Sequence, residues 1–182
     1  MNIVFRNSPN RDKNKKPIDR IIIHWFGTGT LESADKRFMN PKNFVSAHYG
    51  ISGGTIYQWV KEEEVAYHAG VYSMNQRSIG IEHDATTTHP LTSESYDTSG
   101  KLVALVAERW NIPLDRTHII KHSEVKPTQC CGTIDIDKII SLAQKELVKR
   151  KEIIQEITDL GLKPDKLLTE NTYKVLGYKL LT

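Results

Sequence analysis

Two histidines and one cysteine have the residue types and the positions to form a metal site. His24 lies near the end of an apolar run at residues 20–25, where a side chain can emerge into a cleft at the edge of a sheet. His122 directly follows a second predicted strand, residues 117–121, and Cys130 lies eight residues further on, beyond a turn-forming proline. Zinc binds imidazole nitrogen and thiolate sulfur, and a catalytic zinc site uses three protein ligands and leaves one position for water. The three residues are therefore a candidate zinc site, against the ordinary alternative of hydrogen-bonded histidines and a small buried cysteine.

Strands and helices alternate along the chain and must position these residues. Short apolar runs bounded by turn residues predict strands, whereas apolar residues three and four positions apart predict helices. The expected strands cover residues 20–25, 47–52, 55–60, 78–82 and 117–121, of which the second and third form a hairpin around Gly53-Gly54. The expected helices cover residues 33–39, 92–110, 135–159 and 169–176, and Gly100 lies in the middle of the second. This order predicts an α/β fold in which a mixed central β-sheet is flanked by helices.

The last part of the chain is expected to be a helical extension rather than a second domain. From Lys145 onward 38 residues remain, and so short a segment cannot build its own core. It must pack on the main domain, pair with another copy to give a homodimer through the C-terminal helix, or remain a partly exposed helix. We therefore divide the chain into a main domain at residues 1–147 and a C-terminal extension at residues 148–182, whose role the sequence does not reveal.

Composition excludes several classes of protein. Hydrophobic residues make up 38% and charged residues 26% of the 182 residues, which is typical of a globular domain. The two cysteines are neighbours and cannot bridge distant parts of a fold, so a disulfide-built secreted domain is excluded. No apolar run approaches the roughly 20 residues of a membrane helix, and residues 1–16 lack the apolar segment of a signal peptide. We expect synthesis in the cytoplasm and no insertion into a membrane.

The net charge is +3, and the excess of basic residues is concentrated in the first twenty positions. A basic arm is typical of proteins that bind nucleic acid or another anionic polymer. The alternative interpretation is a solvated, partly mobile terminus. Because no zinc-finger spacing and no RNA-recognition signature accompany the arm, we favour that alternative and expect no nucleic-acid partner.

Short motifs follow one another along the chain in an order that carries a family resemblance. They are Ile21-Ile22-Ile23-His24, Val45-Ser46-Ala47-His48-Tyr49, Ala66-Tyr67-His68-Ala69-Gly70, Ser78-Ile79-Gly80-Ile81-Glu82, His122-Ser123-Glu124-Val125 and Thr128-Gln129-Cys130-Cys131-Gly132. Over about residues 18–147 the chain resembles the zinc-dependent N-acetylmuramoyl-L-alanine amidases of the type-2 amidase and peptidoglycan recognition protein superfamily. The Ser-Ala-His-Tyr and Ile-Gly-Ile-Glu forms are most similar to those of phage and prophage endolysins of Gram-positive hosts.

The resemblance implies a zinc ligand set and two catalytic residues. His24, His122 and Cys130 match the first, second and third zinc ligands of the family. Glu82 matches the acidic residue that serves as the catalytic base in members with the Ser-Ala-His form. Thr128 lies two residues before the third ligand, where many members carry an oxyanion-stabilising lysine and some a threonine. A hydrogen bond from Thr128 to the developing oxyanion is the role that this match implies.

Two positions depart from the family pattern. Ala47 stands where other branches carry a catalytic tyrosine, so the resemblance places the role of base on Glu82. Cys131 stands where the family prefers proline, and it is an alternative third ligand one position out of register. Cys130 remains the expected ligand, because it is the residue that matches the family position.

Imidazole and aromatic side chains are candidates for substrate binding. His68 lies in a Tyr-His-Ala-Gly segment that the family places along the substrate groove, and a packed histidine is the equal alternative. Trp25 offers an apolar face to a sugar or a peptide, although single aromatic residues are more often part of a core. His48 follows Ala47 on the hairpin, so the two side chains point to opposite faces and we expect His48 to be structural.

The function implied by the resemblance is zinc-dependent hydrolysis of the amide bond between N-acetylmuramic acid and the L-alanine of the peptidoglycan stem peptide. Zinc polarises a carbonyl and lowers the pKa of its water to about 7, and Glu82 would pass a proton from the water to the leaving nitrogen. The expected setting is an endolysin that acts on the cell wall after release through a holin pore. The alternatives are a cytosolic amidase that recycles muropeptides and a non-catalytic peptidoglycan-binding module.

Overall fold

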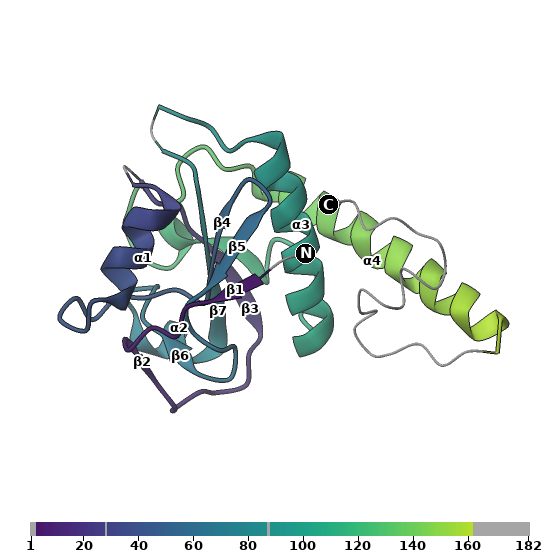
Figure 1. The fold of residues 1–182 in the computed structure, drawn as a ribbon, viewed down its shortest axis with the longest axis horizontal. Coiled ribbons are helices and arrows are strands. Elements are labelled where there is room, and N and C mark those ends of the chain that lie inside the picture. Colours follow the sequence, from purple (N-terminus) through teal and green to yellow (C-terminus); the bar gives the residue numbers. More distant parts are fainter. Residues whose placement is uncertain (1–2, 28, 87, 162–182) are drawn as a thin grey trace.

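A mixed six-stranded sheet forms the centre of the computed structural model, which describes residues 3–27, 29–86 and 88–161 (Figure 1). In spatial order the strands are β1 (Ile3–Phe5), β5 (Thr55–Gln58), β4 (Tyr49–Ser52), β7 (Ser78–His83), β3 (Arg20–Ile23) and β8 (Ile119–Lys121). Strands β4, β7, β3 and β8 are parallel, β5 is antiparallel to β4, and β1 is parallel to β5. A separate antiparallel pair consists of β2 (Arg11–Asp12) and β6 (Val65–Ala66).

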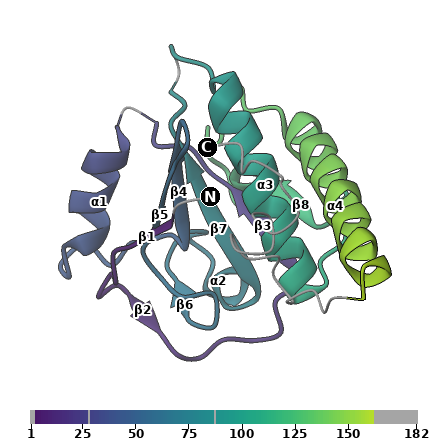
Figure 2. The ribbon, with the colours of Figure 1, turned by 45° about the vertical axis from the view of Figure 1, so that its right-hand side comes forward.

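Helices cover both faces of the large sheet (Figure 2). Helices α3 (Ser93–Trp110) and α4 (Ile136–Asp159) lie side by side on one face, and α1 (Leu31–Met39) lies on the other. A short helix α2 (Tyr72–Arg77) precedes β7, and one 3-10 turn, η1 (His122–Glu124), follows β8. The predicted mixed sheet flanked by helices is confirmed.

The strands and helices expected up to residue 159 are all present, and their ends lie within two residues of the expected ones. The predicted helix at residues 169–176 lies outside the described residues. The short elements β1, β2, β6 and α2 were not predicted. They have two to six residues each, which is too few for a periodic pattern to stand out.

Local caps explain where the two long helices begin. The Thr92 hydroxyl accepts a hydrogen bond from the Ser95 amide at 3.1 Å, and the Asp135 carboxylate accepts one from the Lys138 amide at 3.0 Å. Such caps satisfy amides that have no partner in the first turn. Helix α3 ends at Asn111, which adopts the left-handed conformation with a φ of 54°.

The glycine in the middle of α3 is explained by the packing of α4. A Cβ atom on Gly100 would lie 2.6 Å from the Leu142 Cβ and 3.2 Å from the Leu142 carbonyl carbon. The absence of a side chain therefore lets the two helices approach closely. That contact compensates for the poor helix propensity of glycine.

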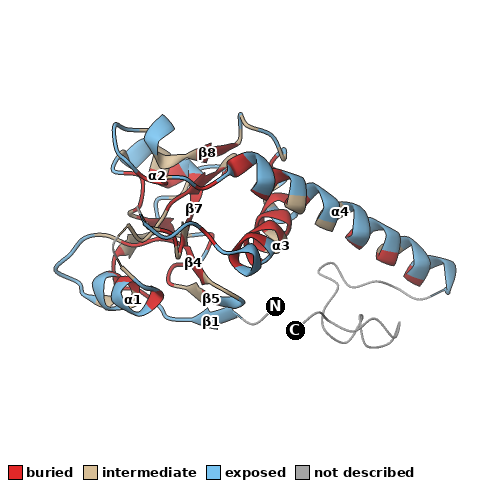
Figure 3. Cartoon of the chain, turned by 90° about the horizontal axis from the view of Figure 1, so that it is seen from above, coloured by how far each residue is buried: buried red, intermediate tan, exposed pale blue. Residues whose placement is uncertain are grey.

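Helix α4 extends beyond the sheet, and much of its distal surface is exposed (Figure 3). It crosses residue 147 without interruption, so the expected boundary between residues 1–147 and 148–182 falls inside one helix. Arg150, whose side chain is only 4% exposed, donates to the Glu108 carboxylate of α3 at 3.0 and 3.1 Å. The proposed division of the chain and the homodimer through the C-terminal helix both stay predictions. No helix within the described ranges is long and apolar enough to cross a membrane.

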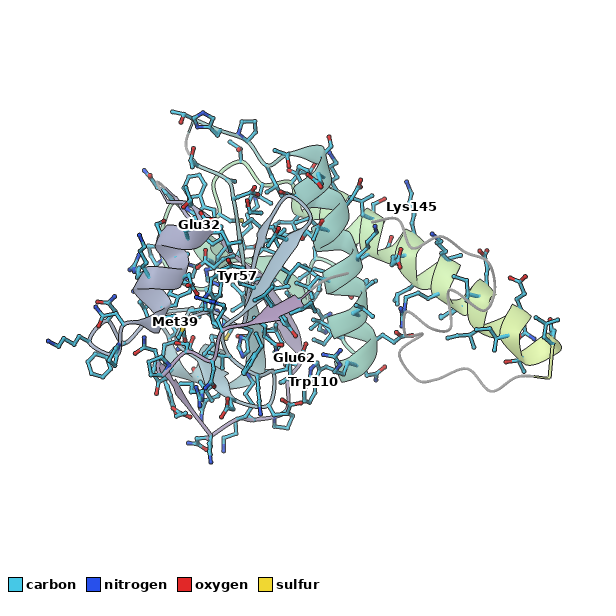
Figure 4. The ribbon with its side chains drawn as sticks, in the orientation of Figure 1. Glu32, Met39, Tyr57, Glu62, Trp110 and Lys145 are labelled. Carbon is cyan, nitrogen blue, oxygen red and sulfur yellow. The ribbon has the colours of Figure 1, made fainter. Side chains whose placement is uncertain are left out.

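A buried carboxylate fastens the hairpin region to the end of α3. Glu62, which is 2% exposed, accepts hydrogen bonds from the Tyr49 hydroxyl at 2.6 Å and the Arg109 guanidinium at 2.6 Å. The Trp110 indole donates to its second oxygen at 2.5 Å, and Figure 4 shows the two side chains next to each other. These three hydrogen bonds to the Glu62 carboxylate link the hairpin region to the end of α3. Losing one of the partners would be costly, because the buried carboxylate would then be less well satisfied.

The N-terminal segment is part of the fold rather than a solvated arm, so that interpretation of the basic residues was wrong. Strand β1 pairs with β5, and β2 pairs with β6. Arg6 forms an ion pair with Asp35 at 2.5 Å, and Arg11 forms one with Glu64 at 3.1 Å. These two basic residues thus neutralise acidic residues of this same chain that are far away in the sequence.

Lys15 places its amine among acceptors in the interior. Its Nζ donates to the carbonyl oxygens of Ser78 at 2.8 Å and Asn75 at 3.3 Å, and lies 3.2 Å from His48 Nε2. His48 Nδ1 accepts from the Gly80 amide at 3.0 Å, so its hydrogen is on Nε2. A neutral amine fits this arrangement, because its two hydrogens match the two carbonyls and it places no positive charge against the Nε2–H group of His48, which donates to the Glu64 carbonyl at 3.1 Å. Burial correspondingly lowers the pKa of Lys15 to about 7, although Glu62, Asp12 and Glu63 act in the opposite direction.

Lys15 should make the stability of the protein depend on alkaline pH. Its pKa is about 7 in the native protein and 10.5 in the unfolded chain, so between these values only the unfolded chain holds the proton. The free energy of unfolding therefore rises with pH across this window, by up to about 1.4 kcal/mol per pH unit. Urea unfolding of Lys15→Met should lack this part of the slope. The exposed neighbour provides the control, because Lys16→Met should keep it; equal slopes in all three proteins would contradict the prediction.

Candidate metal centre

Three neighbouring strands end in polar side chains that lie in one row. Ile23 of β3 pairs with Ile81 of β7 on one side and with Lys121 of β8 on the other. The next residues along the chain are His24, Glu82 and His122. Because the strands are parallel and side chains alternate between faces, these three point away from the α3 side of the sheet. Ile21 and Ile79, whose faces are opposite to theirs, belong to the apolar cluster beneath α3.

The loop after η1 brings Cys130 to this row. The Ser123 amide donates to the Cys130 carbonyl at 3.0 Å, and the Cys130 amide donates to the Thr128 hydroxyl at 3.2 Å. The thiol lies 3.7 Å from His24 Nδ1 and accepts the Trp25 amide at 3.4 Å. One donor atom from each of His24, His122 and Cys130 lies within 4.8 Å of the others. The structure therefore brings together a cluster that is consistent with a metal site.

The electrostatics of the cluster favour neutral imidazoles. Burial, assisted by His68, His122 and His83, lowers the pKa of His24 well below its usual value. Burial also lowers the pKa of His122, while its hydrogen bond to the Ala69 carbonyl has the opposite effect. A neutral imidazole has a lone pair available for a metal ion, so both histidines are held in the ligand form.

The Cys130 thiol needs a positive charge nearby in order to ionise. Burial raises its pKa far above the usual value, and the Glu82 carboxylate raises it further. A coordinating thiol is deprotonated by the charge of the metal ion. Two imidazoles and one such sulfur are a donor set that suits zinc, so these residues fit that metal ion.

Glu82 is the carboxylate that lies beside the cluster. Its Oε2 is buried and forms no hydrogen bond with any described residue. Burial raises its pKa to about 8, against a small opposite effect of Arg37. A buried carboxyl oxygen without a partner is costly to maintain, and such perturbed groups occur most often at functional sites.

A groove of about 400 Å³ opens next to His122. Its walls are largely aromatic, and Phe44 is 75% and Tyr72 47% exposed. The residues that line it are Phe44, Val45, Tyr67, His68, Gly70, Tyr72, Asn75 and His122. The lining of the groove thus includes a residue of the metal cluster, so a molecule bound beside His122 would lie next to the cluster.

Comparison with known families assigns the chain. Residues 14–133 match the model of the N-acetylmuramoyl-L-alanine amidase family, Amidase_2. The chain belongs to this family. It is accordingly a peptidoglycan amidase. No match was found among curated protein sequences.

Solved structures of amidases share the fold. The amidase LysC from Clostridium intestinale is 21% identical, and the match covers 78% of this chain and 96% of that chain, with a TM-score of 0.66. A mutant endolysin from Bacillus subtilis is 20% identical over 79% of this chain and 99% of that chain, with a TM-score of 0.68. AmpD, as its selenomethionine derivative, is 23% identical over 77% of this chain and 93% of that chain, with a TM-score of 0.64.

The amidase structure also places the other residues that the sequence singled out. Thr128 is exposed, and because its hydroxyl oxygen accepts from Cys130, its hydrogen remains available to a substrate. The Trp25 ring packs against Gly132, where a Cβ atom would lie 2.1 Å from the indole. Cys131 is 1% exposed and belongs to the cluster beneath α3. His48 is fully buried among hydrogen-bonding partners. The roles of Thr128 and Trp25 in the amidase reaction stay predictions.

Two supporting groups of the amidase site were missed by the sequence analysis. The Ala69 carbonyl lies 3.0 Å from His122 Nε2, and the Ser78 hydroxyl lies 3.2 Å from His68 Nε2. A main-chain carbonyl leaves no trace in a sequence. Ser78 does leave one, because it shares the face of β7 with Glu82 at a spacing of four residues.

Proposed function

We propose that this amidase hydrolyses the bond between N-acetylmuramic acid and L-alanine in peptidoglycan, with zinc held by His24, His122 and Cys130. The observation that carries the proposal is the convergence of these three donors within 4.8 Å of one another. When bound, zinc would polarise the amide carbonyl and lower the pKa of a water molecule. The remaining catalytic work falls to the residues around the cluster.

Glu82 is the proposed general base. Its buried oxygen has no partner among the described residues, so it is free to accept a proton from the attacking water. Burial raises the pKa to about 8, and a carboxyl group with so high a pKa can both accept a proton and release it near neutral pH. Glu82 would then deliver this proton to the nitrogen of the leaving L-alanine.

Thr128 would stabilise the oxyanion of the substrate, and the groove would bind its sugar or peptide. The free hydroxyl hydrogen of Thr128 is a donor for the developing oxyanion. The aromatic walls formed by Phe44, Tyr67 and Tyr72 suit the apolar faces of a sugar or a peptide. His68 lines the same groove, but both of its ring nitrogens already have partners within the protein. Its contact with substrate would therefore be through ring carbon atoms.

We further propose that the protein acts on the intact cell wall as a phage or prophage endolysin. Its Ser-Ala-His-Tyr and Ile-Gly-Ile-Glu motifs support this setting. The exposed walls of the groove beside His122, where Phe44 is 75% and Tyr72 47% exposed, suit a large substrate. Entry to the wall would follow synthesis in the cytoplasm and release through a holin pore. A non-catalytic binding module is disfavoured because all three ligand positions are filled by metal-binding residues.

Analysis of the digestion products tests the proposal. Purified wall treated with the protein and zinc should release new L-alanine amino termini and no new reducing sugar ends, and both are detectable by mass spectrometry. A chelator should stop the reaction, and added zinc should restore it. Reducing ends without new amino termini would reject the assignment. Rapid cleavage of soluble anhydro-muropeptides with no action on intact wall would instead support the recycling role.

A further inference from the structure

We propose that His68, held by Ser78, is a positioning residue that fixes the orientation and protonation of His24 and thereby sets the affinity of the site for zinc. The inference rests on the proposed zinc-dependent function. It concerns hydrogen bonds within the chain, and its test measures metal binding directly.

The two ring nitrogens of His24 have different partners. Its Nδ1 faces the Cys130 thiol at 3.7 Å, and its Nε2 lies 3.0 Å from His68 Nδ1. Because Nδ1 is the atom at the metal cluster, the ring hydrogen of a neutral, metal-binding His24 must be on Nε2. His24 therefore donates this hydrogen to His68 Nδ1. The two rings are nearly perpendicular, at 88°, which directs the N–H edge of one ring at the other.

The hydrogen bonds of Ser78 make His68 an acceptor at Nδ1. The Ser78 hydroxyl donates its single hydrogen to the Met74 carbonyl at 2.5 Å. Its oxygen is then left to accept, and His68 Nε2 lies 3.2 Å from it. His68 accordingly carries its hydrogen on Nε2 and keeps a lone pair on Nδ1. A main-chain carbonyl in α2 thus fixes the protonation of a metal ligand through two intervening side chains.

The surroundings hold the His68 ring in this one position. A Cβ atom on Gly80 would lie 2.5 Å from His68 Cγ, so the ring packs directly on the glycine of β7. The main-chain amides of His68 and Ala69 both donate to Asn75 Oδ1, at 3.2 and 2.7 Å. Since His68 is 8% exposed, water has little room to replace Ser78 as its partner.

The same short segment supports both histidines of the cluster. The Ala69 carbonyl lies 3.0 Å from His122 Nε2, so that ring too donates away from the metal side. Each ligand imidazole therefore has its second nitrogen bound by one of two adjacent residues, His68 by its side chain and Ala69 by its main chain. Partners of this kind orient metal ligands and increase their basicity, and losing one typically weakens metal binding about 10- to 100-fold.

The test measures zinc dissociation constants of the full chain by competition with a chromophoric chelator. We expect His68→Phe, which removes the acceptor, to bind zinc about 10- to 100-fold more weakly than the parent protein. His68→Asn keeps an acceptor near the position of Nδ1 and should bind with intermediate affinity. Ser78→Ala leaves both rings in the chain but removes the acceptor of His68 Nε2, and it should weaken binding severalfold, because His68 can then change its tautomer. The absorption spectrum of bound Co²⁺ should change in the same variants.

A second serine–histidine pair supplies the matched control. The Ser99 hydroxyl lies 2.8 Å from His83 Nε2, and both residues are fully buried. His83 Nδ1 lies 2.9 Å from the main-chain carbonyl of His24, so this pair contacts the ligand's main chain and not its ring nitrogens. Ser99→Ala should leave the zinc dissociation constant unchanged. Circular dichroism and thermal unfolding verify that each variant is folded, and Ser78→Ala keeps the test decisive should His68→Phe fail to fold.

Three results would overturn the inference. Unchanged zinc affinity in folded Ser78→Ala and His68→Asn would show that the hydrogen bonds do not contribute. An equal loss in Ser78→Ala and Ser99→Ala would show a general effect of destabilisation. If the parent protein binds no zinc, the proposed function fails together with the inference, whereas normal zinc binding in every variant overturns the inference alone.

Discussion

Replacing Glu82 with glutamine is expected to lower kcat for wall hydrolysis by about 10²- to 10⁴-fold, the contribution typical of a general base. The amide has nearly the same shape as the carboxylate but cannot accept the proton of the attacking water. The zinc content should stay at the parental value, because Glu82 is not among the three clustered donors. The measurement is the initial rate of release of L-alanine amino termini from purified wall.

Two comparisons make the Glu82→Gln result specific. Glu32→Gln removes an exposed carboxylate from the first turn of α1 and should retain full activity. Thermal unfolding of Glu82→Gln should occur at or above the parental temperature at pH 9, because a buried carboxylate has been replaced by a neutral group. Full activity in a folded Glu82→Gln would remove Glu82 from the role of base.

The row formed by Glu82, His24 and His122 is the part of the site that the sequence predicts best. His24 follows three isoleucines, Glu82 follows Ile79-Gly80-Ile81, and His122 follows the predicted strand at residues 117–121. The end of a short predicted strand is a recognisable position. The spatial order of the strands in the sheet, by contrast, cannot be predicted from such local patterns. Strand β3 lies between β7 and β8 although these follow it by more than fifty residues, and such pairings depend on burying both faces of all three strands.

The position of Cys130 in the cluster cannot be predicted from the hydrophobic periodicity of the sequence. Its loop is held by separate tertiary contacts, among them the Ser123 amide on the Cys130 carbonyl and the Trp25 amide on the thiol. Sequence spacing alone does not choose between two adjacent cysteines. The family resemblance favoured Cys130. Its sulfur lies in the donor cluster with His24 and His122, whereas Cys131 is 1% exposed and is not among those donors.

The N-terminal residues show the limit of reasoning from composition. A count of charges in the first twenty positions finds an excess of lysine and arginine, but it does not include partners elsewhere in the chain. Arg6 forms an ion pair with Asp35, 29 residues away in the sequence, and Lys15 donates to a main-chain carbonyl more than 30 residues away. The strands that bring them there have two or three residues each, so the local sequence carries no strong strand signal.

Alanine substitutions at the two adjacent cysteines, compared with each other, test which of them is the third zinc ligand. Cys130→Ala removes one of three donors, and we expect zinc to be lost on dialysis and kcat/KM to fall on the order of 10³-fold or more, because the bound metal is worth several kcal/mol in the transition state. Cys131→Ala removes the same thiol one position later, where it is 1% exposed and part of the core. That variant should keep one zinc per chain and parental activity while it unfolds at a lower temperature, since the smaller side chain leaves a cavity. Zinc analysis, wall hydrolysis and thermal unfolding of the two variants therefore give opposite patterns, and the reverse pattern would move the third ligand to Cys131.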